Sequence, residues 1–267
     1  MNNFDTLVSL IRERAKDFNG VLLAYSGGID SMLALTAAKA ADVSVKAYTF
    51  THCLQPSADL SDAIAFARAG DAEHHIIEEH PLENPEVLYN RRDRCYHCKR
   101  GLFTSLRGIA DELGYLLIDG TNADDLTVYR PGRRALEELG VYSPIAECGF
   151  SKAEVREMAA QQGIAYSSKP SGSCYACRLP YNTMITQELI DMIRDSEIAL
   201  EQAGFAQKRV RVHHDINGKA IARIEIEKRL FGEFMDDYAA IADAIKSFGF
   251  TYVTLDLEGW RSGSLDL

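Results

Sequence analysis

Six residues near the N-terminus have the composition of an anion-binding loop: Ser26-Gly27-Gly28-Ile29-Asp30-Ser31. The short apolar run Val21–Leu23 before them predicts a buried strand, and Met32–Ala38 after them predicts a helix. Glycine lets the backbone approach a ligand closely and adopt positive φ angles. The N–H groups and the dipole at the start of a helix attract negative charge. We therefore expect this loop to bind phosphate, although it lacks the Gly-Lys-Ser/Thr ending of a Walker loop.

A second polar segment, Gly120-Thr121-Asn122-Ala123-Asp124-Asp125, follows the predicted strand Tyr115–Asp119. Ligands of parallel sheets bind at the carboxyl ends of the strands, so we expect this segment on the same rim as the glycine loop. Its polar groups suit a nucleotide and the metal ion that accompanies it. Asp124 and Asp125 can instead serve only as the N-terminal cap of a helix.

Four of the six cysteines form two C-x-x-C pairs, Cys95 with Cys98 and Cys174 with Cys177. In a cytosolic protein such pairs indicate metal binding or catalysis rather than structural disulfides. Cys95 and Cys98 lie in the basic run Arg91–Arg100, at the expected start of a helix, where thiolates are favoured. The alternative there is a solvated basic face with incidental cysteines. A further alternative is a tetrahedral zinc ion bound by all four thiolates.

Three arginines are candidates for binding a phosphate group. In the predicted strand Lys208–His214, Arg209 and Arg211 alternate with valine and therefore share one face. Arg178 follows Cys177 in the long irregular segment 165–181, which also reads in part as a domain linker. Guanidinium groups bind phosphate in a bidentate manner. A solvated polar face of the sheet explains the alternation of Arg209 and Arg211 equally well.

Composition limits the class of protein. The 267 residues are 46% hydrophobic and 25% charged, as in an ordinary globular protein. No apolar run approaches the roughly 18 residues of a membrane helix, and the N-terminus lacks the pattern of a signal peptide, so we expect a cytoplasmic protein without a membrane partner. The net charge of −10 argues against a nucleic-acid partner.

Strands and helices alternate along the first two thirds of the chain, which predicts an α/β fold with a doubly wound parallel sheet. We expect a nucleotide-binding domain over residues 1–165 and a cysteine-bearing loop over residues 166–182. A smaller α+β domain over residues 183–267 follows, with the order α-β-β-α-β. Its predicted strands are 208–214, 220–226 and 251–257, and its helices are 186–203 and 231–248.

The glycine loop resembles the pyrophosphate loop of the PP-loop ATPases. Further motifs, in order and spacing, resemble one branch of these enzymes, the ATP-dependent sacrificial sulfur transferases of the LarE family. The similar stretches cover nearly the whole chain: Ser26–Ser31, Gly120–Leu126, Tyr129–Gly132, Lys169-Pro170, Cys174–Arg178, Arg209–Arg211 and Gly259–Ser264.

The resemblance implies an enzyme in the biosynthesis of the nickel-pincer nucleotide of lactate racemase. Its substrate would be pyridinium-3,5-biscarboxylic acid mononucleotide, one carboxylate of which is adenylated by ATP and converted to a thiocarboxylate. Asp30 would bind Mg²⁺. The implied ATP contacts fall on strand ends and the loops after them: Ala24, Ser26, Gly27, Gly28, Asp30, Ser31, Phe50, Gly120, Thr121, Asp124 and Asp125.

Cys174 matches the family's sacrificial cysteine, which attacks the acyl adenylate and becomes dehydroalanine. This chain departs from the single-cysteine pattern, because Cys177 and the pair Cys95 and Cys98 are also present. It therefore resembles the members that hold a 4Fe-4S cluster on three cysteines, here Cys174, Cys177 and one of Cys95 or Cys98. Cys174 and Cys177 are the expected catalytic residues. Relatives of this kind are homo-oligomers, which we also expect here.

Two other functions remain in competition. The first is another PP-loop enzyme, such as an amidotransferase or a tRNA thiolase, although the acidic charge disfavours tRNA. The second is a non-catalytic protein that binds a metal and senses a nucleotide. The intact glycine loop beside Asp124 and Asp125 argues against this second function.

Overall fold

The computed structural model describes residues 2–127, 131–164 and 173–261. The chain forms two compact units. The first comprises the described residues within 1–52, 57–87 and 93–172, and the second those within 53–56, 88–92 and 173–267. No sequence signal indicates the two short early segments of the second unit. The division expected at residues 165 and 182 stays a prediction.

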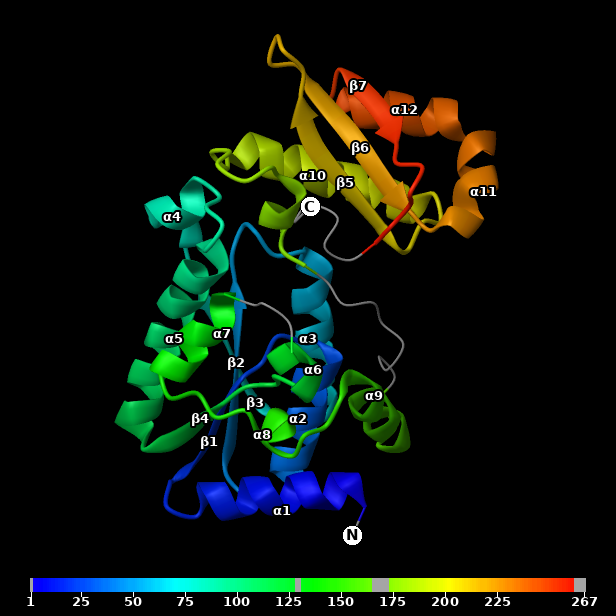
Figure 1. Cartoon of the computed structure of the whole chain (residues 1–267). Coiled ribbons are helices and arrows are strands. Elements are labelled where there is room, and N and C mark those ends of the chain that lie inside the picture. Colours follow the sequence, from blue (N-terminus) through cyan, green and yellow to red (C-terminus); the bar gives the residue numbers. More distant parts are fainter. Residues whose placement is uncertain (1, 128–130, 165–172, 262–267) are drawn as a thin grey trace. The chain divides into compact units, whose positions relative to one another are not determined.

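Four parallel strands form the centre of the first unit (Figure 1). They are β1 (Gly20–Ala24), β2 (Val45–Thr51), β3 (Glu73–Glu78) and β4 (Tyr115–Ile118), in the order β3-β2-β1-β4. In this register Val21 pairs with Val45 on one side and with Leu116 on the other. The predicted α/β fold with a parallel sheet is confirmed.

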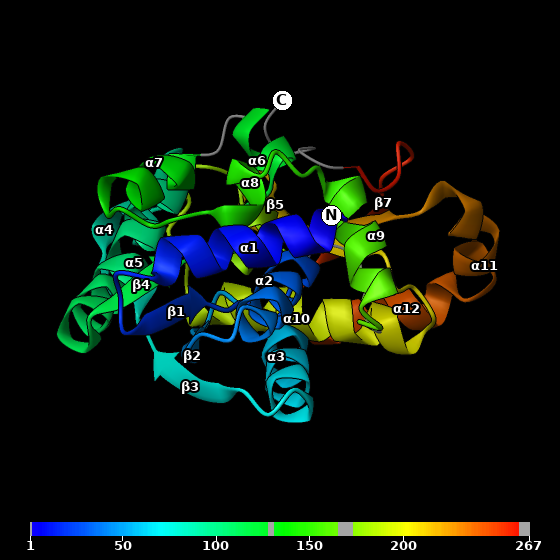
Figure 2. The same cartoon turned by 90° about the horizontal axis from the view of Figure 1, so that it is seen from below.

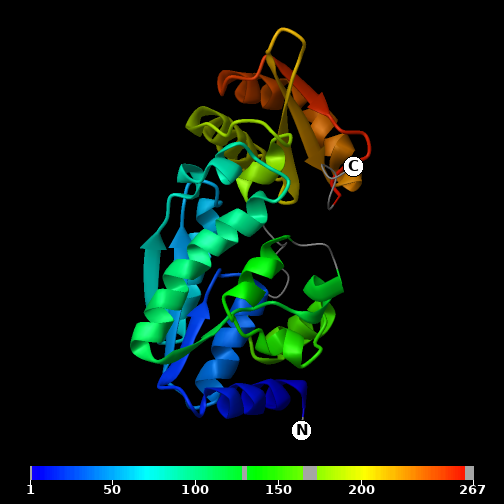
Figure 3. The ribbon, with the colours of Figure 1, turned by 60° about the vertical axis from the view of Figure 1, so that its left-hand side comes forward.

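Helices cover both faces of this sheet, because residues of β1 alternate between two apolar clusters. Val21 and Leu23 face α1, α2, α3 and α9, whereas Leu22 faces α5 and α7. Figure 1 shows α5 on one side of the strands and α2 and α3 on the other, and in Figure 3 α5 (teal) crosses the face of the sheet. Figure 2 shows α1, which packs against α2, from below. The helices of this unit are α1 (Asn3–Ala15), α2 (Ile29–Ala40), α3 (Ser57–Ala69), α5 (Arg94–Leu113), α6 (Ala123–Thr127), α7 (Pro131–Glu138), α8 (Pro144–Glu147) and α9 (Lys152–Gln161), with η1 (Pro81–Glu83) and α4 (Pro85–Leu88) between β3 and α5.

The strand order places a topological switch point beside β1. From β1 the chain adds β2 and β3 on one side and then crosses to add β4 on the other. In open parallel sheets the ligand-binding crevice lies at the carboxyl ends of the strands where the order reverses. The segments that follow β1 and β4 are the glycine loop, which starts at Ser26, and the polar segment that starts at Gly120.

The second unit is built on a three-stranded sheet, so the predicted α+β architecture is confirmed. Strand β5 (Lys208–His214) runs antiparallel to β6 (Ala220–Ile226), and β6 runs parallel to β7 (Tyr252–Leu255). Helix α10 (Gln187–Gln202) packs on β5 and α12 (Tyr238–Ser247) on β7 (Figure 1). The 3-10 helices are η2 (Tyr175–Arg178) and η3 (Lys228–Leu230).

One predicted helix is wrong. The region expected as a single helix, 231–248, is split into α11 (Phe231–Asp236) and α12, with Asp237 between them. Asp237 has φ −112° and ψ 10°, outside helical geometry, and aspartate is a poor residue for a helix interior. The apolar periodicity continues across the break and conceals it.

None of the helices in the described residues is both long and apolar enough to cross a membrane.

Gly120 tests how tightly the two loops of the first unit pack. A Cβ atom at Gly120 would lie 2.8 Å from the backbone nitrogen of Ser31, which belongs to α2. We expect Gly120→Ala to lower the midpoint of urea denaturation, because overpacking costs about 1–3 kcal/mol. The control is Gly108→Ala at an exposed position of α5, where a Cβ meets nothing within 4 Å. That change should stabilise the protein by about 0.5–1 kcal/mol. Equal midpoints for Gly120→Ala and wild type would contradict the packing argument.

Candidate functional site

The loop after β1 is wound around its serines. Gly27 has φ +73°, and Gly28 is the N-cap of α2. The buried Ser31 hydroxyl donates to the carbonyl oxygen of Gly28 (2.9 Å) and lies 3.3 Å from the Ser26 hydroxyl. Half-buried Ala24 ends β1 immediately before the loop. The loop therefore leads directly into the N-terminus of a 12-residue helix, the geometry that binds anions.

The structure brings the two predicted polar segments together. Gly120 packs directly on Ser31, where only glycine fits without displacing backbone atoms. The Asn122 side-chain amide donates to Oδ1 of Asp30 (3.0 Å). The glycine loop and the segment after β4 thus share one edge of the sheet, as expected from the topology.

Asp30 also has a partner that the sequence did not reveal. Lys152, the first residue of α9, forms an ion pair with Oδ2 of Asp30. Both side chains are mostly buried, with 25% and 21% of their surfaces exposed. Ser151 and Glu154 form a capping box that fixes where Lys152 begins the helix. An ammonium group beside a carboxylate at a helix N-terminus can serve either that carboxylate or a bound phosphate.

The remaining polar residues of this rim are engaged with one another. The Thr121 hydroxyl and backbone N–H both donate to buried Asp119. Asn122 and Asp125 cap each other's backbone N–H groups, and Oδ2 of Asp124 accepts from the backbone N–H of Lys152 (2.9 Å). The capping role considered for these aspartates is therefore present, and direct contact with a nucleotide or metal stays a prediction.

Phe50 lies near the end of β2, two residues beyond Tyr48, which is the register partner of Ala24. The half-buried Phe50 ring packs against Phe103 of α5 with its centroid 6.2 Å away. One residue earlier, the buried Thr49 hydroxyl donates to the carbonyl oxygen of Tyr25 (2.6 Å) and ties β2 to the glycine loop. The predicted contact between Phe50 and the nucleotide stays untested.

Cys95 and Cys98 are half-buried thiols in the first turns of α5, at the predicted helix start. Nearby, ligand atoms of Glu86, Asp93 and His97 lie within 4.8 Å of one another. Both of these carboxylates are exposed, and exposed acidic groups commonly gather without a metal ion.

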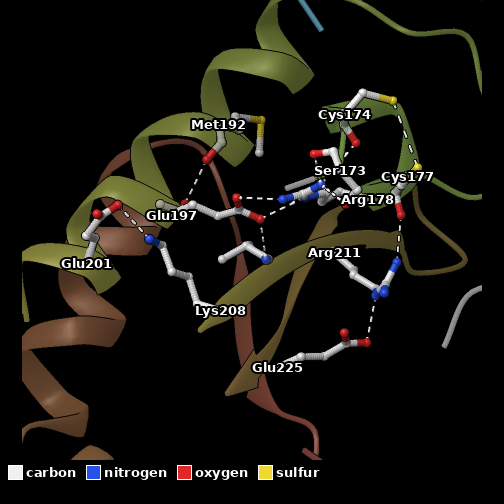
Figure 4. Close-up of polar contacts among 12 residues, drawn as sticks. Ser173, Cys174, Cys177, Arg178, Met192, Glu197, Glu201, Lys208, Arg211 and Glu225 are labelled. Carbon is white, nitrogen blue, oxygen red and sulfur yellow. Dashed lines mark hydrogen bonds and ion pairs between the residues drawn. The ribbon is translucent and has the colours of Figure 1, made fainter. Parts of the chain in front are cut away.

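The second cysteine pair lies on a tight turn in the second unit (Figure 4). Cys174 is the N-cap of η2, and the backbone N–H of Cys177 donates to the carbonyl oxygen of Cys174 (3.1 Å). The two Sγ atoms are 3.9 Å apart, and both residues are half-buried thiols. We call residues Ser173–Pro180 the cysteine turn.

Arg178 ends η2 and is buried, with 5% of its surface exposed. Its guanidinium group makes a bidentate pair with Glu197 of α10, at 2.9 and 3.0 Å. Burial alone would lower the pKa of Arg178, but the Glu197 carboxylate, with smaller contributions from Cys174 and Cys177, raises it above the ordinary value. Arg178 therefore stays charged beside the two cysteines.

Arg209 and Arg211 share one face of β5, as predicted, but differ in their partners. Nε of buried Arg211 donates to Oε1 of Glu225 (2.6 Å) on β6. The Arg209 guanidinium lies over the Trp260 ring, 5.2 Å from its centroid, with no carboxylate within ion-pair distance among the described residues. Burial lowers the pKa of Arg209, and the like charges of Arg178 and Arg211 lower it further.

Asn90 is a further residue that the sequence did not indicate. It is fully buried and has φ +49°, in the left-handed region. Its side-chain amide donates to the carbonyl oxygens of Leu179 (3.0 Å) and Pro180 (2.9 Å) in the cysteine turn. In contrast, the sequence contains a signal for the burial of Glu197, because its spacing places it with Ile193 and Leu200 on the apolar face of α10.

Three motifs of the family resemblance fall wholly or partly outside the described residues. They are Tyr129-Arg130, Lys169-Pro170 and the C-terminal Ser262–Ser264.

Comparison with known proteins places the chain in a family, although no protein-family model matches it. An uncharacterised protein of Synechocystis sp. is 37% identical over 262 residues, 96% of this chain and 95% of that protein. An uncharacterised protein of Methanocaldococcus jannaschii is 30% identical over 94% of each chain. Pyridinium-3,5-bisthiocarboxylic acid mononucleotide synthase of Lactiplantibacillus plantarum is 33% identical over 256 residues, 94% of this chain and 90% of the synthase. On this similarity to a synthase over nearly its whole length, the chain belongs to the LarE family.

Proposed function

We propose that this chain activates a carboxylate of pyridinium-3,5-biscarboxylic acid mononucleotide with ATP and replaces a carboxylate oxygen by sulfur. The product is a thiocarboxylate for the nickel-pincer nucleotide. The observation that carries the proposal is the L. plantarum relative, which aligns with 94% of this chain and is by name a bisthiocarboxylic acid mononucleotide synthase. The anion-binding loop and the cysteine turn support the proposal, because they offer groups suited to the two half-reactions.

The first half-reaction is adenylation. A carboxylate oxygen of the mononucleotide attacks the α-phosphorus of ATP, the bond from that phosphorus to the β-phosphate breaks, and pyrophosphate leaves. The N–H groups of the glycine loop at the start of α2 suit the departing pyrophosphate. Asp30 would bind Mg²⁺, which prefers carboxylate oxygens. The Lys152 ammonium group, which pairs with Asp30, would then serve a phosphate oxygen.

The second half-reaction delivers sulfur to the carbonyl carbon of the acyl adenylate, and AMP leaves. Thiolates of Cys174 and Cys177 are suited to hold a 4Fe-4S cluster, because both are half-buried and Arg178 is charged beside them. The third ligand predicted from the sequence is Cys95 or Cys98. When bound, the cluster supplies the sulfur that is transferred. In the sacrificial alternative the Cys174 thiolate attacks the carbonyl carbon itself, and elimination then breaks its Cβ–Sγ bond and leaves dehydroalanine.

The phosphate group of the mononucleotide would bind to Arg209. Among the three predicted arginines, Arg178 and Arg211 have carboxylate partners in Glu197 and Glu225. The half-buried Arg209 lies near two like charges that lower its pKa, so an anion there would relieve an unfavourable charge.

We also propose the homo-oligomer that the family resemblance implies and a cytoplasmic location, where thiols stay reduced.

Asp30→Asn tests the adenylation step. We expect mononucleotide-dependent release of pyrophosphate to fall by more than the roughly 10–100-fold that loss of an outer-shell metal partner costs. The matched control is Asp111→Asn, an exposed carboxylate of α5 that pairs only with Arg107 among the described residues. The control should keep wild-type activity, and both variants should keep the wild-type circular dichroism spectrum. Undiminished release by Asp30→Asn would remove Asp30 from the mechanism.

Arg209→Ala tests the phosphate contact. A charge-assisted hydrogen bond contributes about 1.5–3 kcal/mol, so the KM for the mononucleotide should rise about tenfold to hundredfold. The KM for ATP should stay within a factor of about two, because the phosphate contact that the change removes belongs to the other substrate. The control is Lys208→Ala on the same strand, where the change breaks the ion pair with Glu201. If KM for the mononucleotide is the same in both variants, Arg209 does not bind its phosphate.

Iron analysis tests the source of sulfur. Protein purified without oxygen should be brown and contain about four irons per chain. Cys177→Ser should lose the colour and repeated turnover, whereas Cys148→Ser, a half-buried cysteine outside both pairs, should keep them. A colourless protein that iron and sulfide cannot reconstitute would contradict the cluster. Loss of hydrogen sulfide from Cys174 by mass spectrometry would then identify the sacrificial reaction.

A further inference from the structure

The cysteine turn is held by buried side chains that donate to its backbone carbonyl groups. Nη1 of Arg178 donates to the carbonyl oxygens of Ser173 (2.6 Å) and Cys174 (3.0 Å). Nη1 of Arg211 donates to the carbonyl oxygen of Cys177 (2.6 Å). Each cysteine therefore has its carbonyl group fixed by a different buried guanidinium (Figure 4).

Each guanidinium group forms an ion pair with a buried carboxylate. Glu197 uses both oxygens for Arg178, and its Oε1 also accepts from the backbone N–H of Val210 on β5 (3.0 Å). Oε1 of Glu225, whose surface is wholly buried, accepts from Arg211 and lies 3.1 Å from Nη1 of Arg223. The two carboxylates thus connect the cysteine turn to helix α10 and to the sheet.

These contacts are needed because the turn is short. Helix η2 has four residues, and a 3-10 helix of that length has poor hydrogen-bond geometry and little stability of its own. The backbone that carries the two Sγ atoms, which are 3.9 Å apart, is therefore held mainly by the contacts to the ends of the turn. A guanidinium that is not held by a carboxylate samples other rotamers and hydrogen-bond partners.

We propose that Glu197 and Glu225 are positioning residues, which fix Arg178 and Arg211 so that these hold Cys174 and Cys177 in place for sulfur transfer. Arg178 and Arg211 then act on the backbone of the turn, and phosphate binding is left to Arg209. The proposal rests on the proposed function only in that the cysteines are the sulfur-bearing groups. Each carboxylate binds an arginine, and each arginine binds the backbone of the turn, so the carboxylates act on the turn through the arginines.

Two variants and a matched control test the proposal. Glu197→Gln and Glu225→Gln keep the size of the side chain and remove its charge. Glu201→Gln is the control, because Glu201 lies one turn after Glu197 on α10 and pairs with Lys208 instead of the turn. Arg211→Lys is a further variant that keeps the positive charge but cannot hold Glu225 and the Cys177 carbonyl group with the same fork.

The first readout is amide hydrogen exchange of the peptide that contains residues 173–180, in otherwise folded protein. We expect exchange to become about tenfold faster in Glu197→Gln, Glu225→Gln and Arg211→Lys, because loss of one hydrogen-bonded partner weakens local closure by about that factor. Exchange in α10 and in Glu201→Gln should stay at the wild-type rate. An unchanged rate for the turn in the carboxylate variants would overturn the proposal, and so would equal acceleration throughout the second unit. If a glutamine variant does not fold, Arg211→Lys decides.

The second readout is the amount of thiocarboxylate formed per pyrophosphate released. Positioning predicts that this ratio falls at least about tenfold while the KM for ATP stays at the wild-type value, because only the sulfur step depends on the turn. A faster-exchanging turn with an unchanged ratio would contradict a positioning role. If the wild type releases no pyrophosphate, the proposed function fails, whereas the exchange result still decides whether the carboxylates hold the turn.

Discussion

A guanidinium group buried in a protein needs a carboxylate, and this requirement organises the second unit. Arg178 and Arg211 expose only 5% and 1% of their surfaces. Leaving a buried charge of this kind unpaired costs about 3–5 kcal/mol. Glu197 and Glu225 avoid that cost by forming ion pairs with Arg178 and Arg211. Other N–H groups of the two arginines donate to the cysteine turn. Placement of the sulfur atoms thus follows from electrostatics more than from the propensity of a four-residue helix.

The first unit depends on close backbone approach rather than on charge. Gly120 lets the end of β4 lie against Ser31, and this contact joins the two polar segments of the rim. Asp30 can then contact Asn122 and Lys152, which are far from it in the sequence. A loop at a helix N-terminus and a carboxylate paired with an ammonium group are compatible with chemistry on a Mg²⁺-bound nucleotide.

The parts of the fold with a strong period could be predicted from the sequence. The apolar run around Leu22 and the alternation of Arg209 and Arg211 with valine both predict strands, and β5 and β6 have the expected bounds. The motif Ser26–Ser31 was expected where a strand leads into a helix, and it lies at the junction of β1 and α2. The break at Asp237 was missed because the apolar period of α11 continues into α12.

Pairings between distant residues could not be predicted in this way. Lys152 lies 122 residues from Asp30, and Asn90 lies 89 residues from Leu179. No local pattern indicates such partners. The roles expected for Arg178 and Arg211 illustrate the difficulty, because a sequence shows an arginine but not the glutamate that it pairs with. What an arginine binds depends on which of its donors the fold leaves available.

A single-turnover reaction of the wild-type protein with ATP and pyridinium-3,5-biscarboxylic acid mononucleotide distinguishes a sulfur transferase from other enzymes that adenylate. Pyrophosphate and AMP are quantified, and the molecular mass of the mononucleotide is measured by mass spectrometry. We expect pyrophosphate and AMP to appear in equal amounts only when the mononucleotide is present, and the mass of the mononucleotide to increase by the exchange of one oxygen for one sulfur. Pyrophosphate release at the same rate without the mononucleotide, or a mononucleotide of unchanged mass after AMP release, would contradict this expectation.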